Sequence, residues 1–328
     1  MTRTAWGTLS TARINGLVLE GARESELAEF VAVASRDRAR GEDFAREHGI
    51  ERVHDSYDAL LADDTVEAVY IPLPNSMHVE WSVRALEAGK HVLCEKPLTR
   101  DPAAVERAFD AAERAGRLLS EAFMWRHNPQ TRRLVELLAD GAVGELRHVR
   151  SSFAFLLEDP GNVRMSEELE GGSLMDVGCY CVSGSRLFAG GEPESVFGQA
   201  RMGDGVDVRF AATLRFPGDV TASFDCGFDM VPRHDLELVG TEASLFVADP
   251  WHARRPGIER RNADGEVERI EVERANSYGL ELDDMSAAIR DGGRPLLGRE
   301  DALGQARTIE ALYASAAAGS AVRTEEDR

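Results

Sequence analysis

The chain has no long hydrophobic run and few cysteines. None of its apolar stretches approaches the roughly 18 residues that a membrane helix needs, and residues 1–15 lack a signal-peptide hydrophobic region. Its cysteines match no zinc or disulfide framework; they are Cys94, Cys179, Cys181 and Cys226. We therefore expect a cytoplasmic protein with no membrane association, no metal site and reduced thiols.

An excess of positive charge is also absent. The formal net charge is -20 over 328 residues. Binding to duplex nucleic acid requires a basic face that replaces counterions. The composition therefore argues against a nucleic-acid partner, and any phosphate group of a ligand must be bound by local groups.

The length favours two domains, and the first 122 residues alternate between strand-like and helix-like patterns. Strands are expected over 5–9, 28–34, 67–73, 91–94 and 118–123. Helices are expected over 36–49, 76–89 and 102–116. This alternation is typical of βαβ units around a parallel sheet, so residues 1–122 are predicted to form a doubly wound Rossmann domain.

The pattern changes after residue 122. Helices are expected over 129–141, near 173–189 and over 299–319. Strands are expected over 145–157, 206–216, 219–228, 234–240, 243–249 and 267–273. Consecutive strands with short turns form antiparallel sheets, so residues 123–328 are predicted to form an α+β domain on a mostly antiparallel open sheet. An apolar exposed face on 206–216 would make the protein a homo-oligomer.

The stretch 7-GTLSTA-12 is expected to join the first strand to the first helix. A nucleotide-binding fold needs small residues there, because the backbone must approach a pyrophosphate at the helix N-terminus. Ser10 and Ala12 stand where more glycines are expected, so a tight turn without a ligand is the alternative. The predicted cofactor contacts are Gly7, Ser10, Thr11, Ala12, Arg13 and Ile14.

The second strand ends in 33-VASRDR-38. NAD enzymes commonly carry an acidic residue at this place, whereas an arginine accommodates the 2′-phosphate of NADP. Ser35 and Arg36 occupy the position, so NADP is predicted in preference to NAD. The alternative is a solvated helix face, and Arg38 is a weaker candidate than Arg36.

Four motifs resemble those of the glucose-fructose oxidoreductase / inositol dehydrogenase (Gfo/Idh/MocA) family of nicotinamide oxidoreductases. The resemblance covers essentially the whole chain, and the EKP tripeptide is its most specific part. The motifs are 7-GTLSTARI-14, 72-PLPNSMH-78, 93-LCEKPLT-99 and 171-GGSLMDVGCY-180.

The resemblance implies catalytic roles for three residues. Lys96 would lie near the reacting hydroxyl, and the Lys96–Pro97 bond is often cis in the family. Tyr180 would be the general acid/base, as in the tyrosine-type subgroup that contains dimeric dihydrodiol dehydrogenase and the NADP xylose dehydrogenases. Asp176, four residues before Tyr180, would share its helical face and orient the substrate. The alternatives are a lysine paired with Glu95 and an ordinary half-buried tyrosine.

Further residues are expected around the two ligands. Those predicted beside the cofactor are Pro72, Asn75, His78, Glu95 and Lys96. Those predicted beside the substrate are Trp125, Arg126, His127, Phe153, Asp176 and Tyr180. Asn75 could instead cap a helix, Phe153 could belong to the core, and Ser173 can cap the helix that follows it.

The resemblance implies an NADP-dependent dehydrogenase of a pyranose, of the xylose or glucose 1-dehydrogenase type, or of a trans-dihydrodiol, acting as a homodimer or homotetramer. A ketoreductase of nucleotide-linked deoxysugars is the first alternative, and Arg126, Arg164 and Arg233 could then form a basic patch for the diphosphate. A non-catalytic nucleotide-binding regulator and a cofactor-dependent glycoside hydrolase are further alternatives.

Overall fold

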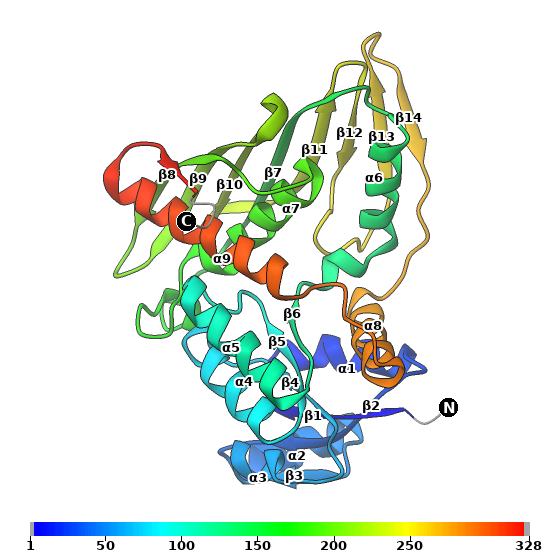
Figure 1. Ribbon diagram of the computed structural model, residues 1–328, viewed down its shortest axis with the longest axis vertical. Coiled ribbons are helices and arrows are strands. Elements are labelled where there is room, and N and C mark those ends of the chain that lie inside the picture. The colour runs from blue at the N-terminus through cyan, green and yellow to red at the C-terminus, as the bar shows by residue number, and fades with distance from the viewer. Residues whose placement is uncertain (1–2, 325–328) are drawn as a thin grey trace. The chain divides into compact units, whose positions relative to one another are not determined.

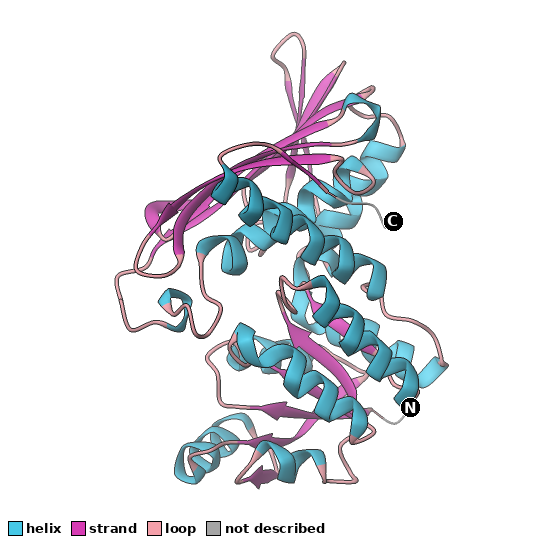
Figure 2. Ribbon diagram, turned by 60° about the vertical axis from the view of Figure 1, so that its left-hand side comes forward, coloured by secondary structure: helices cyan, strands magenta, loops and turns pink. Residues whose placement is uncertain are grey.

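The computed structural model describes residues 3–324, which divide into two compact units (Figures 1 and 2). Unit 1 comprises the described residues up to Met124 together with Asn276–Leu303. Unit 2 comprises Trp125–Ala275 and the described residues from Gly304 onward. The predicted division at residue 122 had placed 276–303 in the second domain. Among residues 3–324, no helix has the length and apolar character to cross a bilayer.

Unit 1 is built on a six-stranded sheet whose strands all pair in parallel, in the order β3-β2-β1-β4-β5-β6. The predicted parallel doubly wound sheet is confirmed. Its strands are β1 (Thr4–Leu9), β2 (Ala28–Ala34), β3 (Arg52–His54), β4 (Ala68–Ile71), β5 (His91–Glu95) and β6 (Leu119–Ala122).

Local signals set the ends of several unit 1 helices. Asp37 and Asp101 accept backbone N–H groups at the starts of α2 and α5, and Gly49 and Gly116 end these helices with positive φ. The helices are α1 (Asn15–Glu24), α2 (Arg38–His48), α3 (Tyr57–Leu61), the 3₁₀ turn η1 (Asn75–Met77), α4 (His78–Glu87), α5 (Pro102–Ala115) and α8 (Ser277–Asp291).

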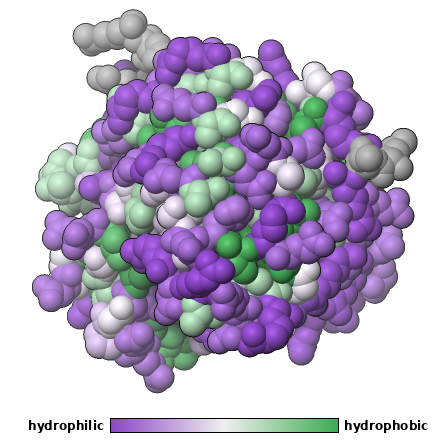
Figure 3. All heavy atoms as spheres, turned by 90° about the horizontal axis from the view of Figure 1, so that it is seen from below, coloured by the Kyte–Doolittle hydropathy of each residue, from purple (hydrophilic) through white to green (hydrophobic). Residues whose placement is uncertain are grey.

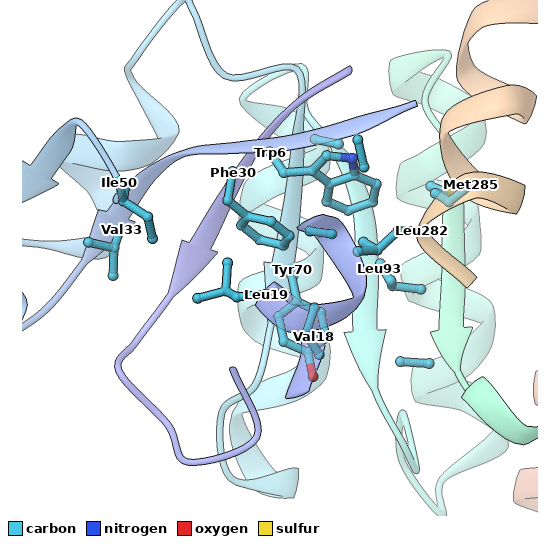
Figure 4. Packing of buried hydrophobic residues seen from close by; sticks show 14 of the residues in the cluster. Trp6, Val18, Leu19, Phe30, Val33, Ile50, Tyr70, Leu93, Leu282 and Met285 are labelled. Atoms are coloured by element: carbon cyan, nitrogen blue, oxygen red, sulfur yellow. The ribbon is translucent and has the colours of Figure 1, made fainter. Parts of the chain in front are cut away.

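Helix α8 belongs to unit 1 because it packs directly on α1 and the sheet. A Cβ placed on Gly21 would lie 2.5 Å from the backbone nitrogen of Gly279, so the two helices cross at a distance that only glycine permits. The Trp6 indole donates to the Ser286 hydroxyl at 3.1 Å. Figure 4 shows Leu282 and Met285 of α8 beside Trp6 in the core cluster of this unit. This packing explains why 276–303 is not part of unit 2.

Unit 2 is built on a nine-stranded sheet in the order β14-β13-β12-β11-β7-β10-β9-β8-β15. Its pairings are antiparallel except for β7 with β10. The predicted mostly antiparallel open sheet is confirmed. Its strands are β7 (Leu146–Leu156), β8 (Ser195–Met202), β9 (Asp207–Arg215), β10 (Thr221–Gly227), β11 (Asp229–Gly240), β12 (Ala243–Val247), β13 (Ile258–Asn262), β14 (Val267–Ile270) and β15 (Val322–Arg323).

The long helices of unit 2 lie on one face of its sheet (Figure 2), with α7 packed against β7 and β10. They are α6 (Pro129–Ala139), α7 (Cys179–Ala189) and α9 (Arg299–Ala318), of which α9 begins within unit 1. The sequence did not predict the helices α3 and α8 or the strands β3, β8, β13 and β15, because each is short or lacks a clear apolar period.

The visible surface is mostly hydrophilic. Figure 3 shows hydrophilic residues over most of one face of the molecule, with hydrophobic residues in small groups. The expectation of an apolar exposed face on β9 is wrong: the exposed positions of this strand alternate with buried ones. They are Arg209, Ala211, Thr213 and Arg215.

Candidate functional site

The turn between β1 and α1 is tight although it contains no glycine. Ser10 has a φ of 123°, a conformation that non-glycine residues rarely adopt. Buried Asn15 holds the turn, because its amide donates to the Ser10 carbonyl at 2.7 Å and its Oδ1 accepts from the Thr8 hydroxyl at 2.9 Å. Strained backbone of this kind clusters at ligand-binding sites.

The motif in this turn starts later than the sequence analysis assumed. Ser10, Ala12 and Asn15 have the spacing of the three glycines of G-x-G-x-x-G. Gly7 lies inside β1, where a Cβ would come within 2.8 Å of Leu60, so its missing side chain serves strand packing. Gly7 therefore belongs to the core rather than to a cofactor site. Asn15 was missed because a buried asparagine gives no signal of its own in a sequence.

The other predicted residues of the turn differ in their surroundings. Arg13 is exposed, whereas Ile14 packs against the core cluster just before α1. The carbonyl of Thr11 accepts from the Arg40 guanidinium at 3.2 Å. The N-terminal backbone N–H groups of α1 follow this turn and provide the usual binding site for an anion.

The end of β2 carries cationic side chains. The Ser35 hydroxyl donates to the Asp37 carbonyl at 2.7 Å, and the Asp37 carboxylate caps α2 by accepting from the Arg40 N–H at 3.1 Å. This acidic residue is therefore engaged by the backbone. Arg36 is exposed and lies beside Tyr57, where burial raises the pKa of the Tyr57 phenol and the guanidinium opposes that rise.

Arg38 and Arg40 have different partners. Arg38 forms ion pairs with Glu42 and Asp55, both at 2.8 Å. Arg40 instead joins the end of β2 to the first turn through its bond to Thr11. The sequence analysis preferred Arg36 to Arg38 but did not single out Arg40, whose position depends on the fold.

The segment after β4 contains three predicted residues. Pro72 is buried, and its carbonyl accepts from the Ser10 hydroxyl at 3.4 Å. Asn75 is the first residue of η1, after Pro74 at the N-cap position. His78 is buried with one ring nitrogen 2.8 Å from the Pro97 carbonyl and the other 2.8 Å from the Leu73 carbonyl.

His78 supports the loops rather than facing a ligand. Burial lowers the pKa of its imidazole to about 4, the neighbouring Lys96 adds to the decrease, and the two carbonyls oppose it. The ring is therefore neutral near neutral pH. Because both of its nitrogens face backbone carbonyls, the prediction of a direct cofactor contact is replaced by a role in joining the end of β4 to Pro97.

Lys96 follows β5 in a turn that buried groups hold on several sides. The Lys96–Pro97 peptide bond is cis, as the family resemblance implied. The N–H of Leu98 donates to the buried Glu121 carboxylate at 2.7 Å. Glu95 accepts from the Tyr70 hydroxyl at 2.5 Å and from the Lys96 N–H at 3.3 Å. These hydrogen bonds hold the backbone on both sides of Lys96.

The fold brings three of these segments to one edge of the sheet. Ser10, Pro72 and Lys96 follow β1, β4 and β5, which are neighbouring parallel strands. The strand order reverses between β1 and β4. Ligands of open α/β sheets bind outside the carboxyl ends of the strands at such a switch point.

In unit 2, Asp176 and Tyr180 lie at the entry to α7. Residues Leu174–Gly178 form a π-helical turn, a rare element that is frequent at functional sites. Tyr180 follows in the first turn of α7 and is 7% exposed. The Asp176 carboxylate forms an ion pair with the Arg164 Nε at 2.6 Å, which the sequence analysis did not expect.

A buried carboxylate holds the start of the π-helical turn. Asp207 on β9 accepts from the Ser173 hydroxyl at 2.6 Å, the Leu174 N–H at 2.8 Å and the Tyr313 hydroxyl at 2.7 Å. Burial raises the pKa of Asp207, and these donors oppose the rise. Ser173 therefore does not cap the helix as predicted; Asp207 binds the helical N–H in its place.

Aromatic rings surround Tyr180. Its ring centroid lies 5.3 Å from that of Phe153 and 5.8 Å from that of Trp251. Phe153 also packs edge-on against His234 and His252. The sequence analysis found Phe153 but missed the other three, because the 249-DPWHARRPG-257 loop and β11 are adjacent to it only in the folded sheet.

Trp125, Arg126 and His127 lie in the aromatic region of unit 2, and two of the three are buried. The Trp125 ring packs edge-on against Trp251 at 5.2 Å, behind the ring that contacts Tyr180. Burial lowers the pKa of His127 to about 3, so it is neutral near neutral pH. Arg126 donates to the Ser183 hydroxyl at 3.4 Å. A pocket-lining role for Trp125 and His127 is therefore less direct than predicted.

Within residues 3–324, no group of His, Cys, Asp and Glu side chains is arranged to hold a metal ion. The four cysteines are buried and form no disulfide.

Comparisons with known proteins agree with this arrangement. A family model described as "Oxidoreductase family, NAD-binding Rossmann fold" matches residues 11–123, and one described as "GFO/IDH/MocA C-terminal domain" matches residues 131–246. The chain is 39% identical over 325 residues to a D-xylose 1-dehydrogenase (NADP(+)) of Haloferax volcanii, covering 97% of this chain and 98% of that protein.

Two solved structures are similar over nearly the whole chain. An aldose-aldose oxidoreductase from Caulobacter crescentus, complexed with glycerol, has a TM-score of 0.92 at 27% identity and covers 98% of this chain and 100% of that one. A 3-ketoreductase from Actinomadura kijaniata, in complex with NADP and TDP-benzene, has a TM-score of 0.90 at 33% identity and covers 96% and 98%.

Proposed function

This chain belongs to the GFO/IDH/MocA family of oxidoreductases, and we propose that it is an NADP-dependent dehydrogenase of a free pyranose sugar, of the xylose or glucose 1-dehydrogenase type. The similarity to the xylose dehydrogenase of Haloferax volcanii over nearly the whole chain supports this substrate class. A trans-dihydrodiol remains a second substrate of the same chemistry.

The cationic end of β2 is the observation that carries the cofactor assignment. Arg36 is exposed there, Arg40 reaches the first turn, and the nearby Asp37 carboxylate is occupied by a backbone N–H. An NAD site would present a carboxylate to the ribose hydroxyl. The residues that would hold NADP are Ser10, Thr11, Ala12, Arg13, Ile14, Ser35, Arg36, Arg40, Pro72 and Asn75.

The proposed chemistry divides among three side chains. A bound nicotinamide supplies the hydride acceptor or donor. In the oxidative direction Tyr180, as phenolate, takes the proton of the sugar hydroxyl. The role of the Lys96 ammonium would be to stabilise the developing alkoxide of the bound sugar, because a positive charge favours an anion that forms beside it. Asp176, with Arg164 as its partner, orients the sugar.

The unit 2 arginines favour a free sugar over a nucleotide-linked one. The alternative ketoreductase needs cationic groups for a diphosphate. Arg164 is paired with Asp176, and Arg233 lies 3.2 Å from Asp225 and 3.9 Å from Asp235. Their charges are therefore offset by carboxylates, which weakens the proposed phosphate patch.

The test is NADPH formation with a panel of pyranoses, polyols and trans-diols, with NAD run in parallel. We expect turnover of xylose or glucose with a preference for NADP. Turnover of only a nucleotide-linked keto-sugar would replace the proposal with the ketoreductase. Tight NADPH binding without any turnover would favour a non-catalytic regulator. Hydrolysis of a glycoside with a cofactor that survives dialysis would favour a glycosidase.

We also propose a homodimer or homotetramer in the cytoplasm. Exposed apolar side chains on the strands of unit 2 support an oligomer, and four cysteines that form no disulfide fit a reducing compartment. The exposed side chains are Leu156, Met202, Val231 and Val267. Sedimentation equilibrium measures the subunit number, and a mass of one chain would contradict the oligomer.

A further inference from the structure

Tyr70 connects the core of unit 1 to the Lys96 turn. Its side chain is fully buried on β4, and Figure 4 shows its ring beside Val18 in the core cluster. The hydroxyl donates to Glu95 Oε1 at 2.5 Å, while Glu95 Oε2 accepts from the Lys96 N–H at 3.3 Å. The carboxylate is therefore held between a buried phenol and the backbone of the proposed catalytic lysine.

Tyr70 can act only as a donor in this bond. Burial, followed by the nearby Glu95 carboxylate, raises the pKa of its phenol well above the ordinary value. The phenol therefore keeps its proton at any pH at which the enzyme works. A carboxylate that accepts a hydrogen bond is stabilised as an anion, and part of its charge is satisfied by the donor.

Other titratable groups also act on this cluster. On α8, Tyr278 and buried Glu281 face Tyr70, and burial followed by Glu95 raises the pKa of Glu281 well above the ordinary range. Burial therefore favours the uncharged form of Glu281. Glu121 on β6 accepts from Leu98, and neutral His78 contacts Pro97, so both hold the backbone after Lys96.

The Tyr70 hydroxyl binds the Glu95 carboxylate directly. The carboxylate also attracts the ammonium of Lys96, the next residue in the chain, because opposite charges close together attract. We propose that Tyr70 is a positioning residue for Lys96: by donating to Glu95, its hydroxyl limits the pull of that carboxylate on the ammonium and leaves the positive charge for the substrate. The catalytic part of this inference rests on the proposed function. The predicted effect of Tyr70 and Glu95 on the pKa of Lys96 does not.

The sequence offers a direct test, because Lys90 and Lys96 are its two lysines. A protein labelled with ¹³Cε-lysine gives two side-chain signals, and Lys90→Arg assigns them. Lys90 is an internal reference, since its ammonium binds the Asp63 and Val66 carbonyls at 2.8 Å each. Titration of the Lys96 signal then reports its pKa without substrate or turnover.

Three variants separate the partners. Tyr70→Phe frees the Glu95 charge and should raise the Lys96 pKa by about half a unit, roughly a threefold change in proton affinity. Glu95→Gln should lower it, because the negative charge is gone. The double variant should match Glu95→Gln, since without the carboxylate the phenol has no effect. The Lys90 pKa should not change.

Two results would overturn the proposal: an unchanged Lys96 pKa in Tyr70→Phe, or a change in the same direction as in Glu95→Gln. Glu95→Gln tests the premise that Glu95 acts on Lys96. An unchanged Lys96 pKa in this variant would refute the proposal even if Tyr70→Phe does not fold.

Kinetics separate this inference from the proposed function. With an active sugar dehydrogenase, Tyr70→Phe should lower kcat several-fold while the Kd for NADP stays the same, because Tyr70 acts through Lys96. If the wild type turns over no sugar, the proposed function fails, and the lysine titrations still decide the role of Tyr70.

Discussion

The Ser10 turn in unit 1 and the Tyr180 segment in unit 2 are held in different ways. The turn is fixed by residues within a few positions of it, since Thr8 and Asn15 form its main hydrogen bonds. The Tyr180 segment is fixed by Asp207 and Tyr313, which are far away in the sequence. The groups that form the main hydrogen bonds of the first segment therefore lie next to it in the sequence, whereas those that hold the second come from distant parts of the chain.

The largest expected effect tests the reacting end of the Tyr180 segment. Tyr180→Phe removes the proposed acid/base, so kcat for the sugar should fall by about 100-fold or more. The Kd for NADP, measured by fluorescence, should change little. Phe153→Leu, a change in the ring beside Tyr180, is the control and should lower kcat far less. Near-normal turnover of Tyr180→Phe would refute its role.

The next prediction concerns His78, which contacts the Pro97 carbonyl after Lys96, and the dependence of the free energy of unfolding on pH. The pKa of His78 is lowered to about 4 in the folded state, against about 6.5 in an unfolded chain. The unfolded state therefore binds the proton first as the pH falls, and stability decreases through this window. Between about pH 7 and about pH 5 the loss from His78 is roughly 2 kcal/mol.

His78→Gln keeps a donor for one carbonyl but does not titrate. The free energy of unfolding in urea should therefore fall less for this variant than for the wild type over the same pH range. Above about pH 7, where neither residue 78 side chain changes its protonation, the free energies of unfolding of the two proteins should change with pH in the same way. An identical loss in both on acidification would show that His78 gains its proton without cost in the folded state.

A third prediction compares two arginines that follow β2. Arg36→Ala should weaken NADP binding by about tenfold or more, because a charge-assisted bond to the 2′-phosphate is lost. NAD binding should stay the same. Arg38→Ala is the matched control, since Arg38 is paired with Glu42 and Asp55. Equal losses for NADP and NAD in Arg36→Ala would mean that this residue only shapes the loop.

The smallest expected effect concerns the distant support of the Tyr180 segment. Tyr313→Phe removes one of the donors to Asp207 and should lower the free energy of unfolding by about 1 kcal/mol. The kcat should fall by a few-fold at unchanged Kd for NADP, because the π-helical turn loosens. A stability loss without any change in kcat would show that Asp207 supports the fold but not the position of Tyr180.

Much of the fold was predictable from local patterns. The unit 1 strands other than β3 stood out as apolar runs, and helices such as α5 carried both an Asp cap and a terminal glycine. The positions of Lys96, Asp176 and Tyr180 followed from motifs. Elements without such signals were missed. The strands β8 and β13 have mixed polarity, and α8 packs on unit 1 where Gly279 meets Gly21, which is distant in the sequence.

The sequence by itself determined the fold class and the family, and it singled out the side chains proposed to react, because these depend on local periodicity and on short motifs. Only the tertiary structure decided that Gly7 serves packing, that the two ring nitrogens of His78 face carbonyls, that Arg164 pairs with Asp176 and that Tyr70 donates to Glu95. Each of these contacts depends on which groups meet across strands and helices and on how far burial removes water from them. A single position of the chain does not specify either the contact or the burial.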